Sequence, residues 1–442
     1  MPKKSKLLNT IGEHFSDIEI DVKQIPISEL KNLTICMKDL TDYRNNASYK
    51  LLENSVMITF IGLLADCNEW TEIYDFLILH YDWFESFLDF SYGIPSLSTL
   101  KRNIAIIDTE ELEQICVNYM INKIKDYEKM FNIESNNEKD IIAYDGKKCN
   151  GSSVVDGSNG EKLPTNAMSA YNVDKDLCLA TKFIGEKTNE IPTGPELIKL
   201  LDLTNTISTF DALNTQKKTI QAIVDKGGDY VGALKGNQHN FYDDVKTAFE
   251  DSKFIETAQK KSSYETTEKA HNQIEKRTYV MTEDIKWLST EKWAKIKSIG
   301  FCKKETIKND KVTIEIRYYI TSLGVDEIKD FSRAIRSEWG IENNLHWHLD
   351  YTFKEDYNKT CTKNAQANLN ILRKQALNLI KLVKPLYNNF SLKRIRKRIG
   401  QNFEQEINTI FSYLSIDELT KNILKFKKQL IYPVSNYIFF II

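Results

Sequence analysis

The chain has 442 residues, of which 41% are hydrophobic and 28% are charged. This length predicts two or three domains, and the composition excludes a chain too polar to build a real core. The net charge is only −2, so the average charge gives no indication of a nucleic-acid partner, and any basic surface must be local.

Residues 1–135 are predicted to form an N-terminal helical domain. Apolar residues recur every three or four positions in "LLENSVMITFIGLLADCNEWTEIYDFLILHYDWFESFL" and "TEELEQICVNYMINKIKDYEKMF", which is the spacing of amphipathic helices. Between these runs, Pro95 and the neighbouring serines suit a turn and an N-cap before a helix that carries Lys101 and Arg102. These two bases are candidate DNA contacts, and residues 1–135 are the predicted region that binds the DNA ends. The polar stretch "NIESNNEKD" that follows has the composition of a linker.

A different pattern begins after the linker. Short β-type runs, among them "DIIAYDGKKC", "LCLATKFIG", "NTISTFDAL" and "DYVGALKGN", alternate with the helix-like "GPELIKLLDL" and "TQKKTIQAIVDKGG". The glycine pair that ends the second helix is typical of a helix C-terminus. Strands alternating with helices predict an α/β domain with a mixed or parallel sheet covered by helices.

A β-rich insertion is predicted from about residue 237 to 323, where runs such as "KVTIEIRYYITSL" follow a short helix. Helical stretches then return, and residues 386–442 form a predicted basic tail. Residues 370–442 carry 13 Lys or Arg against 4 Asp or Glu. A basic surface of this kind can bind phosphate, although a solvated helix face explains the same charges equally well. The densest run, "SLKRIRKRIG", supplies the candidate DNA contacts Lys393, Arg394, Arg396, Lys397 and Arg398.

The seven cysteines are widely spaced and form no CxxC pair, which argues for free thiols in a reducing cytoplasm. The N-terminus lacks an apolar core long enough for a secretory signal. The longest apolar runs, "SVMITFIGLLADC" and the C-terminal "YIFFII", are shorter than the roughly 20 residues of a membrane-spanning helix. We therefore expect a cytoplasmic protein with no membrane partner.

Two predicted strands end on a carboxylate, Asp145 in "IIAYDGKK" and Asp211 in "STFDALNTQ", and Glu342 lies in a later helix. An Asp in this position can simply be the N-cap of the next helix. If the strand ends are neighbours, however, the three carboxylates can converge, and divalent cations would keep all three ionised. Two such cations can activate a nucleophile and stabilise the leaving oxygen at phosphorus, and oxygen ligands favour Mg²⁺ or Mn²⁺. In a chain with 62 acids the spacing alone is a weak signal.

The chain resembles the DDE transposases of bacterial insertion sequences, specifically the H-repeat-associated family. The similarity spans roughly residues 40–385 in the right order. It rests on long segments, among them "IAYDGKK", "KTNEIPTGPELIKLLDL", "TFDALNTQKKTIQAIVDKGGDYVGALKGNQ", "WGIENNLHWHLDYTFKED" and "NAQANLNILRKQALNLIK". The shorter "LTDYRNNASYKL" and "GIPSLSTLKR" resemble the N-terminal region of the family.

This resemblance implies a ribonuclease H-like catalytic domain over residues 136–385, preceded by the helical domain. It places the β-rich insertion between the second and third acids, in agreement with the 131-residue step from Asp211 to Glu342. It also implies that Asp145, Asp211 and Glu342 form the catalytic, metal-binding triad. The cofactor would be Mg²⁺, replaceable by Mn²⁺, as two ions.

Two positions depart from the family pattern. Related transposases often carry a basic residue or His four positions before the Glu and a Lys seven positions after it, where this chain has Glu338 and Leu349. Arg336 lies close by in the sequence, but on a different helical face. The contacts that hold a DNA end near the metals are therefore expected to differ here, with Arg336 as a candidate.

Other candidates surround the triad. His346 shares a helical face with Glu342 and is expected to support the site or to contact DNA rather than to bind zinc. Lys235 follows a predicted strand and could meet a phosphate as a point charge, with Asn237 and Gln238 beside it. A turn of solvated polar residues explains "LKGNQ" equally well.

Several remaining side chains are given structural interpretations. Trp339 and Trp347 are expected in the core rather than as groups that stack on bases. Glu355 and Asp356 match the family pattern and are expected to be structural.

The sequence is interpreted as an insertion-sequence transposase of the bacterial cytoplasm, associated with the nucleoid. It would bind the terminal inverted repeats of its element and target DNA, hydrolyse a phosphodiester and transfer the strand, with at least a dimer in the synaptic complex. One alternative is a catalytically inactive DNA-binding relic or regulator. Another is a metal-dependent nuclease that cuts DNA without joining it.

Overall fold

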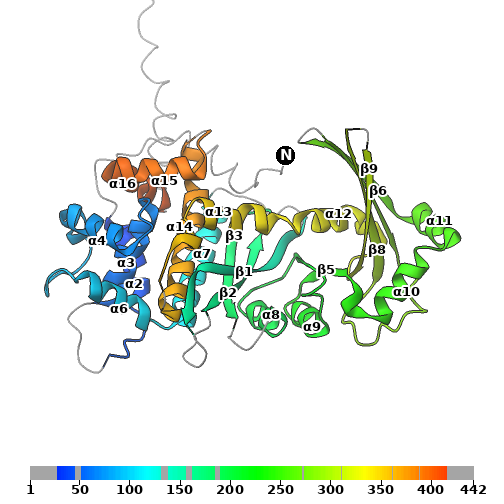
Figure 1. The fold of residues 1–442 in the computed structure, drawn as a ribbon, viewed down its shortest axis with the longest axis horizontal. Helices are drawn as coiled ribbons and strands as arrows, with labels where there is room; N and C mark the ends of the chain where they lie inside the picture. The colour runs from blue at the N-terminus through cyan, green and yellow to red at the C-terminus, as the bar shows by residue number, and fades with distance from the viewer. Residues whose placement is uncertain are drawn as a thin grey trace, which may run out of the picture.

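The structure, a computed structural model, describes residues 27–44, 51–130, 138–155, 162–184, 190–270, 273–309, 311–360, 362–387 and 389–415. A helical body occupies one end of the molecule, and a sheet with helices on both faces crosses the middle and extends to the other end (Figure 1). The apolar run "YIFFII" and the lysines beyond residue 415 lie outside the described residues. None of the described helices is both long and apolar enough to cross a membrane.

The described strands form one nine-stranded sheet in the order β3-β2-β1-β4-β5-β9-β8-β7-β6. Their bounds are β1 Asp140–Val155, β2 Lys162–Asn172, β3 Leu177–Ile184, β4 Thr206–Phe210, β5 Asp229–Leu234, β6 Ser263–Ala270, β7 Gln273–Thr282, β8 Ser298–Lys308 and β9 Lys311–Thr321. β4 runs parallel to both β1 and β5, and the other neighbouring strands are antiparallel. The predicted α/β class with a mixed sheet is confirmed.

Alternating side chains of the central strands supply two different cores. Ile142 and Tyr144 of β1 pack with α8 (Glu190–Lys199) and α9 (Lys217–Asp225) on one face. Ile141 of β1 packs on the other face with Phe331 of α12 (Ile328–Ser337). Because side chains of a strand alternate in direction, Asp145 follows Ile141 and Ala143 onto the α12 face.

The predicted β-rich insertion corresponds to β6–β9 together with α10 (Asn240–Ala248) and α11 (Ser252–Lys261). It continues the central sheet, because β9 pairs with β5 through partners such as Leu234 and Tyr318. β6 was not predicted from the sequence. It is an edge strand of mostly polar residues, so it lacks the apolar alternation by which a half-buried strand is recognised.

The N-terminal helical region is confirmed. Its helices are α2 Ile27–Met37, α3 Leu52–Leu64, α4 Trp70–Leu79, α5 Tyr81–Glu85, α6 Leu97–Ile106 and α7 Thr109–Met130. Ser96 caps α6 by accepting a hydrogen bond from the Thr99 backbone N–H, as the sequence predicted. These helices pack around α14 (Lys363–Val383), which also contacts β3. α14 therefore joins the helical body to the sheet.

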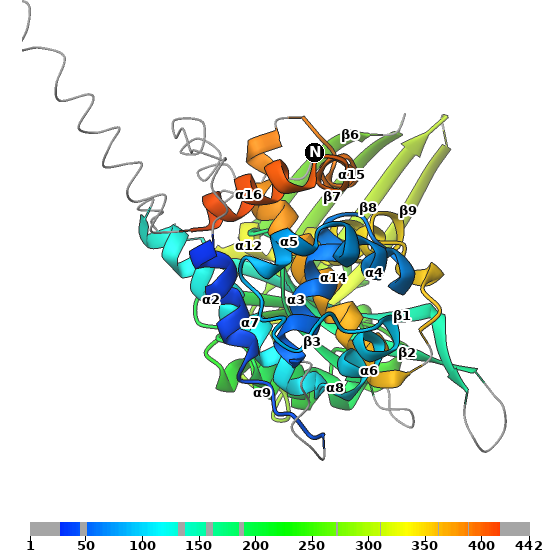
Figure 2. The same cartoon turned by 90° about the vertical axis from the view of Figure 1, so that its left-hand side faces the viewer.

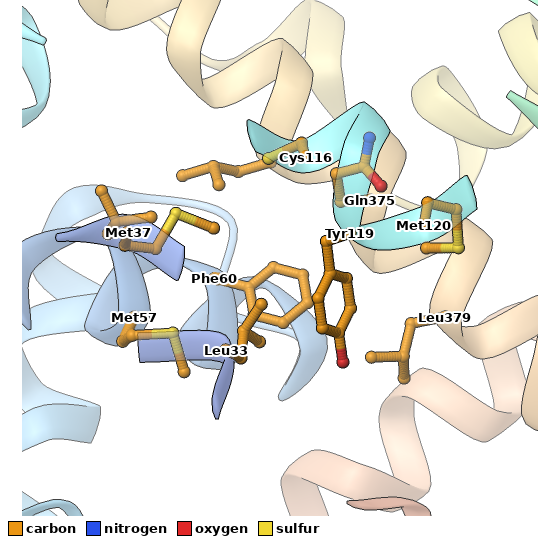
Figure 3. A pocket seen from close by; sticks show the side chains of 11 residues that line it. Leu33, Met37, Met57, Phe60, Cys116, Tyr119, Met120, Gln375 and Leu379 are labelled. Atoms are coloured by element: carbon orange, nitrogen blue, oxygen red, sulfur yellow. The ribbon is translucent and has the colours of Figure 1, made fainter. Parts of the chain in front are cut away.

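An apolar cavity lies inside the helical body (Figure 3). It is lined from α2, α3, α7 and α14, and includes Met37, Phe60, Met120 and Leu379. No charged side chain lines it, so this cavity offers no acid or base for catalysis.

The basic segment after residue 386 is more ordered than a tail. Its first part forms α15 (Leu392–Gln401) and α16 (Phe403–Leu414), which lie against the N-terminal helices (Figure 2). Ile395, Ile399 and Phe411 are fully buried in the helical core. Residues 391–414 of the predicted basic tail, 386–442, therefore form part of the helical body.

Arg396 is a correction to the predicted DNA contacts. The residue has no exposed surface, and its guanidinium donates to the Leu63 and Thr352 carbonyls and to the Asn68 side chain. Asp66 lies 3.1 Å from the guanidinium, and burial lowers the pKa of Arg396 to about 10. Since this side chain is used inside the protein, it is not available to a phosphate.

We expect Arg396→Ala to destabilise the protein by about 3–5 kcal/mol, because the carbonyls and Asp66 around it would lose their partner. The neighbouring Lys397 is exposed, so Lys397→Ala should change the stability by less than about 0.5 kcal/mol. Denaturant unfolding of both variants is the measurement. Equal stability of the two variants would contradict a structural role for Arg396.

Candidate active site

The site begins with the pairing of β1 and β4. These strands run parallel, with Tyr144 opposite Phe210, so Asp145 and Asp211 follow this pair side by side. Asp211 comes directly after the end of β4, but Asp145 lies within β1, opposite Ser169 of β2, so the prediction that a strand ends on Asp145 is wrong. Both follow the strand positions that face α12. Asp211 Oδ1 also accepts hydrogen bonds from the backbone and side chain of Asn214, at 3.0 and 3.1 Å. Asp211 thus shapes the turn before α9 as well as lying beside Asp145.

The third acid, Glu342, comes from the helical segment that follows α12. After α12 the chain makes a π-helical turn, Glu342–His346, and continues as α13 (Trp347–Tyr351). The Lys381 ammonium of α14 donates to the Asn344 carbonyl at 2.8 Å. This contact gives the Asn344 carbonyl a hydrogen-bond donor at a point where the helix is irregular.

His346 joins two of the three acids. Its Nδ1 lies 3.0 Å from Glu342 Oε2 and 3.5 Å from Asp145 Oδ2. These three side chains form the one group of potential metal ligands found among the described residues, with ligand atoms within 4.8 Å of one another. Asp211 stands outside this tight group. The ring is buried, and its Nε2 has no hydrogen-bond partner among the described residues.

The electrostatics of the site reflect crowded carboxylates. Burial raises the pKa of Asp145 to about 6, against the lowering effect of His346, and the charges of Glu190 and Glu342 raise it further. The hydrogen bond from His346 lowers the pKa of Glu342. In the described part of the chain, no Lys or Arg nitrogen lies within 4.0 Å of Asp145, Asp211 or Glu342. Hard divalent cations suit such a set of uncompensated oxygen ligands.

Two further acids belong to the site and were not among the predicted site residues. Glu338, on the turn before Glu342, is 17% exposed. Burial raises its pKa to about 7 against the lowering effect of Arg317, 3.9 Å away, and the charges of Asp211 and Asp145 raise it further. The sequence marked Glu338 only as a departure from the family pattern. The site is therefore more acidic than three residues suggest.

The second of these acids is Glu190, at the start of α8. Asn214 Nδ2 donates to Glu190 Oε2 at 3.0 Å and so links Glu190 to Asp211. A Cβ atom on Gly146 would lie 2.1 Å from Glu190 Oε1, so only glycine allows this approach beside Asp145. Glu190 lies in one of the family-like segments, but no local pattern distinguishes it from other surface acids.

The remaining acids of the region are neutralised by bases. Lys147 donates to Asp350 at 2.7 Å and lies within 3.9 Å of Glu355 and Asp356. Glu355 is buried and lies 3.7 Å from Arg373. These contacts join β1 to the segment after α13, and they account for Glu355 and Asp356 without a metal.

Comparison with known proteins identifies the family of the chain. A family model described as "Transposase DDE domain" matches residues 138–379, and one described as "DDE_Tnp_1-associated" matches residues 34–120. The chain belongs to the DDE transposase family. It is 31% identical over 374 residues to "Putative transposase YncI" of Escherichia coli O157:H7, covering 82% of this chain and 90% of that protein.

A second relative of this DDE-family protein is "H repeat-associated putative transposase YhhI" of Escherichia coli strain K12. It is 29% identical over 363 residues, covering 80% of this chain and 91% of the relative. The resemblance to H-repeat-associated transposases is thereby confirmed. A solved structure, "Cryo-EM structure of piggyBac transposase synaptic complex with hairpin DNA (SNHP)", aligns with a TM-score of 0.35 and 11% identity, covering 98% of this chain and 86% of that one.

The predicted DNA contacts of this DDE-family protein are spread over several surfaces. Lys101, Arg102 and Lys235 are exposed, as are Lys393, Arg394, Lys397 and Arg398 of α15. Arg398 is paired with Glu406. Arg336 is half-exposed and forms an ion pair with Glu268.

The side chains beside Lys235 hold a turn together. Asn237 and Gln238 both donate to the Ala212 carbonyl, at 2.7 and 2.8 Å. They support the segment that follows Asp211 and brace this side of the site.

The two tryptophans near the third acid are not in the core. Trp339 is 56% exposed and Trp347 is 49% exposed, so the prediction that they are buried is wrong. Their positions follow from Ile341, Leu345 and Leu349, which take the buried face of the same helical segment.

A test of the acidic site uses protein stability without metal. Glu338 has a folded-state pKa above its ordinary value, so its folded state holds a proton more tightly. That stabilisation is present below about pH 4.5 and is lost as the pH rises through about 7. Glu338→Gln, which stays neutral, should stabilise the metal-free protein by about 2–3 kcal/mol at pH 8 and by little at pH 4. Urea unfolding in EDTA at both pH values checks this, and an equal effect at both would contradict it.

Proposed function

We propose that this protein is an active transposase that binds the terminal inverted repeats of its insertion sequence, hydrolyses a phosphodiester and joins the freed 3′ end to target DNA. The observation that supports it best is the convergence of Asp145, Glu342 and His346 beside Asp211, without a neighbouring Lys or Arg. Carboxylates in such a cluster repel one another, and this repulsion destabilises the metal-free protein. Bound divalent cations would remove the repulsion. The ribonuclease H-like core would be formed by β1–β5.

Asp145, Asp211 and Glu342 would hold Mg²⁺ or Mn²⁺, as two ions. Their carboxylate oxygens are ligands that these cations prefer, and Asp145 and Glu342 lie in the close group of potential ligands, with Asp211 outside it. The metal, when bound, supplies activation of the attacking oxygen and stabilisation of the leaving oxygen. The chain's own groups have separate tasks. Asp145 is held within β1, Asp211 follows the end of β4, and His346 orients Glu342 through the 3.0 Å contact. Fixed ligands of this kind need little reorganisation during the reaction.

DNA would be held by exposed cations on two sides of the site. The exposed bases of α15 provide sequence-independent contacts to phosphate, and Lys101 and Arg102 on α6 are placed on a helix that could read base edges. Two element ends imply at least two copies of the chain in the synaptic complex. Such a protein acts on the bacterial chromosome, in the cytoplasm.

The two alternatives predict different outcomes. A relic or regulator without catalysis would bind terminal repeats and never cut them, with either metal. A nuclease would cut, but would leave the 3′ ends unjoined. The retained acids support an enzyme over a relic, and a strand-transfer assay separates a transposase from a nuclease.

We expect Glu342→Gln to lower cleavage of a terminal-repeat duplex in Mg²⁺ or Mn²⁺ about a thousandfold, which corresponds to about 4 kcal/mol of transition-state stabilisation. Binding of the same duplex, followed by gel shift, should persist because Gln removes a charge that repels phosphate. Asp145→Asn and Asp211→Asn should behave alike, and double variants should be little worse because the three act as a unit.

Glu256→Gln is the matched control, since Glu256 is exposed on α11 and pairs only with Lys260 among the contacts found. It should cut at the normal rate. Normal cleavage by Glu342→Gln would overturn the proposed triad. Absence of cutting by the wild-type chain with both metals would favour the DNA-binding relic.

The basic face of α15 gives a second expectation. Lys393→Ala with Lys397→Ala should weaken binding to any duplex and lower the slope of log affinity against log salt by about 0.9 for each lost phosphate contact. Lys253→Ala with Lys261→Ala removes two exposed lysines from α11, at the other end of the molecule (Figure 1), and should leave the slope unchanged. An unchanged slope in the α15 variant would exclude that face as a phosphate contact.

A further inference from the structure

Beside Glu342, the π turn brings a residue to the surface that a regular helix would place differently. The Trp347 backbone N–H donates to the Glu342 carbonyl, which is an i to i+5 bond, whereas an α-helix pairs residues four apart. Trp347 therefore lies one turn of the wider π-helix after Glu342. His346 points inward to the acids, and Trp347 is left half-exposed next to them.

Trp347 is the first ring of a short stack, and it also packs edge-to-face against His348, with ring centroids 4.8 Å apart. Its ring stacks on Tyr351, with centroids 4.5 Å apart and an angle of 24° between the planes. Tyr351 is 50% exposed, and the Lys393 ammonium of α15 lies 4.1 Å from the centre of its ring. We refer to Trp347 and Tyr351 as the aromatic platform. It begins one helical turn after Glu342 and contacts α15 through Lys393.

The contacts found for the platform are those between its two rings and those with His348 and Lys393. Neither ring belongs to any apolar core cluster of the described chain, and aromatic rings left half in water forgo much of the burial that usually stabilises them. Exposed aromatic side chains next to cations are the features with which proteins hold single-stranded nucleic acid, because every base has a face that can stack.

We propose that the aromatic platform is a stacking site for an unpaired base of the DNA strand next to the phosphodiester that the acids would attack. Lys393, whose ammonium lies over the Tyr351 ring, would contact a phosphate of the same strand. The inference rests on the proposed function for the identity of the strand. A protein partner is the other class that binds exposed aromatics, and the cation on the ring and the adjoining acids favour nucleic acid over it.

The test compares binding of a 20-nucleotide oligo-dT strand and of a blunt 20-base-pair duplex, in EDTA so that no chemistry occurs. Trp347→Ala should weaken binding of the single strand about 5- to 100-fold, the range for loss of one aromatic stacking contact. It should change duplex binding by less than about twofold. Trp347→Phe should retain most of the affinity for the single strand, since a ring remains.

Trp287→Ala is the matched control, because Trp287 is 45% exposed on the loop between β7 and β8. It should bind both DNAs like the wild type. Thermal unfolding of each variant identifies a folding defect, and Trp347→Phe then decides the question. Wild-type affinity of Trp347→Ala for the single strand would overturn the proposal, as would equal losses for strand and duplex or a loss of self-association in place of DNA binding.

These outcomes are separable from those of the catalytic proposal. Loss of single-strand binding by Trp347→Ala in a chain that never cleaves DNA would support the platform and defeat the catalytic proposal. Cleavage by the wild type, with unaltered single-strand binding in Trp347→Ala, would support catalysis and defeat the platform.

Discussion

The parallel pairing of β1 with β4 is the constraint on which the site depends. Since Tyr144 lies opposite Phe210, the next residues, Asp145 and Asp211, lie side by side. The alternation of side chains along each strand places both on the face of the sheet that α12 covers. A shift of one residue in either strand would send one carboxylate to the opposite face of the sheet. The buried alternation of Ile141, Ile142 and Tyr144 prevents that shift, so the hydrophobic core sets the geometry of the charged site.

A second layer of polar contacts fixes the helices above the strands. Lys374 of α14 donates to Ser169 and Thr181 of the sheet, at 2.8 and 2.9 Å. Asn378 bonds both the backbone N–H and the carbonyl of Cys178. Because buried polar groups are costly unless they are paired, these contacts specify one orientation of α14 against the sheet. Lys381, on the same helix, contacts the π turn that carries Glu342.

The acids of the site destabilise the fold, in contrast to these paired polar contacts. Burial raises the pKa of Asp145 and of Glu338, and no Lys or Arg among the described residues pairs with Asp145. A folded protein accepts such a cost where a ligand or a reaction needs it.

The sequence by itself determined the class of the fold, many of its helices and strands, and the family, but it missed β2 and β6. Periodic apolar residues identify helices and strands locally, and the long segments around Asp145, Asp211 and Glu342 carry the resemblance. Local patterns also located the cap at Ser96. They could not reveal β6, because an exposed edge strand has no apolar alternation to read.

Tertiary structure alone decided which side chains meet. It buried Arg396 within a run of five similar bases, and exposed Trp347 within a helix whose other face is apolar. It also brought Glu190 and Glu338 to the acids. Each outcome depends on contacts between residues tens to hundreds of positions apart, such as Arg396 with Leu63. Charge and spacing along the chain do not encode such distances, because the direction of a side chain is set by the packing of its whole element.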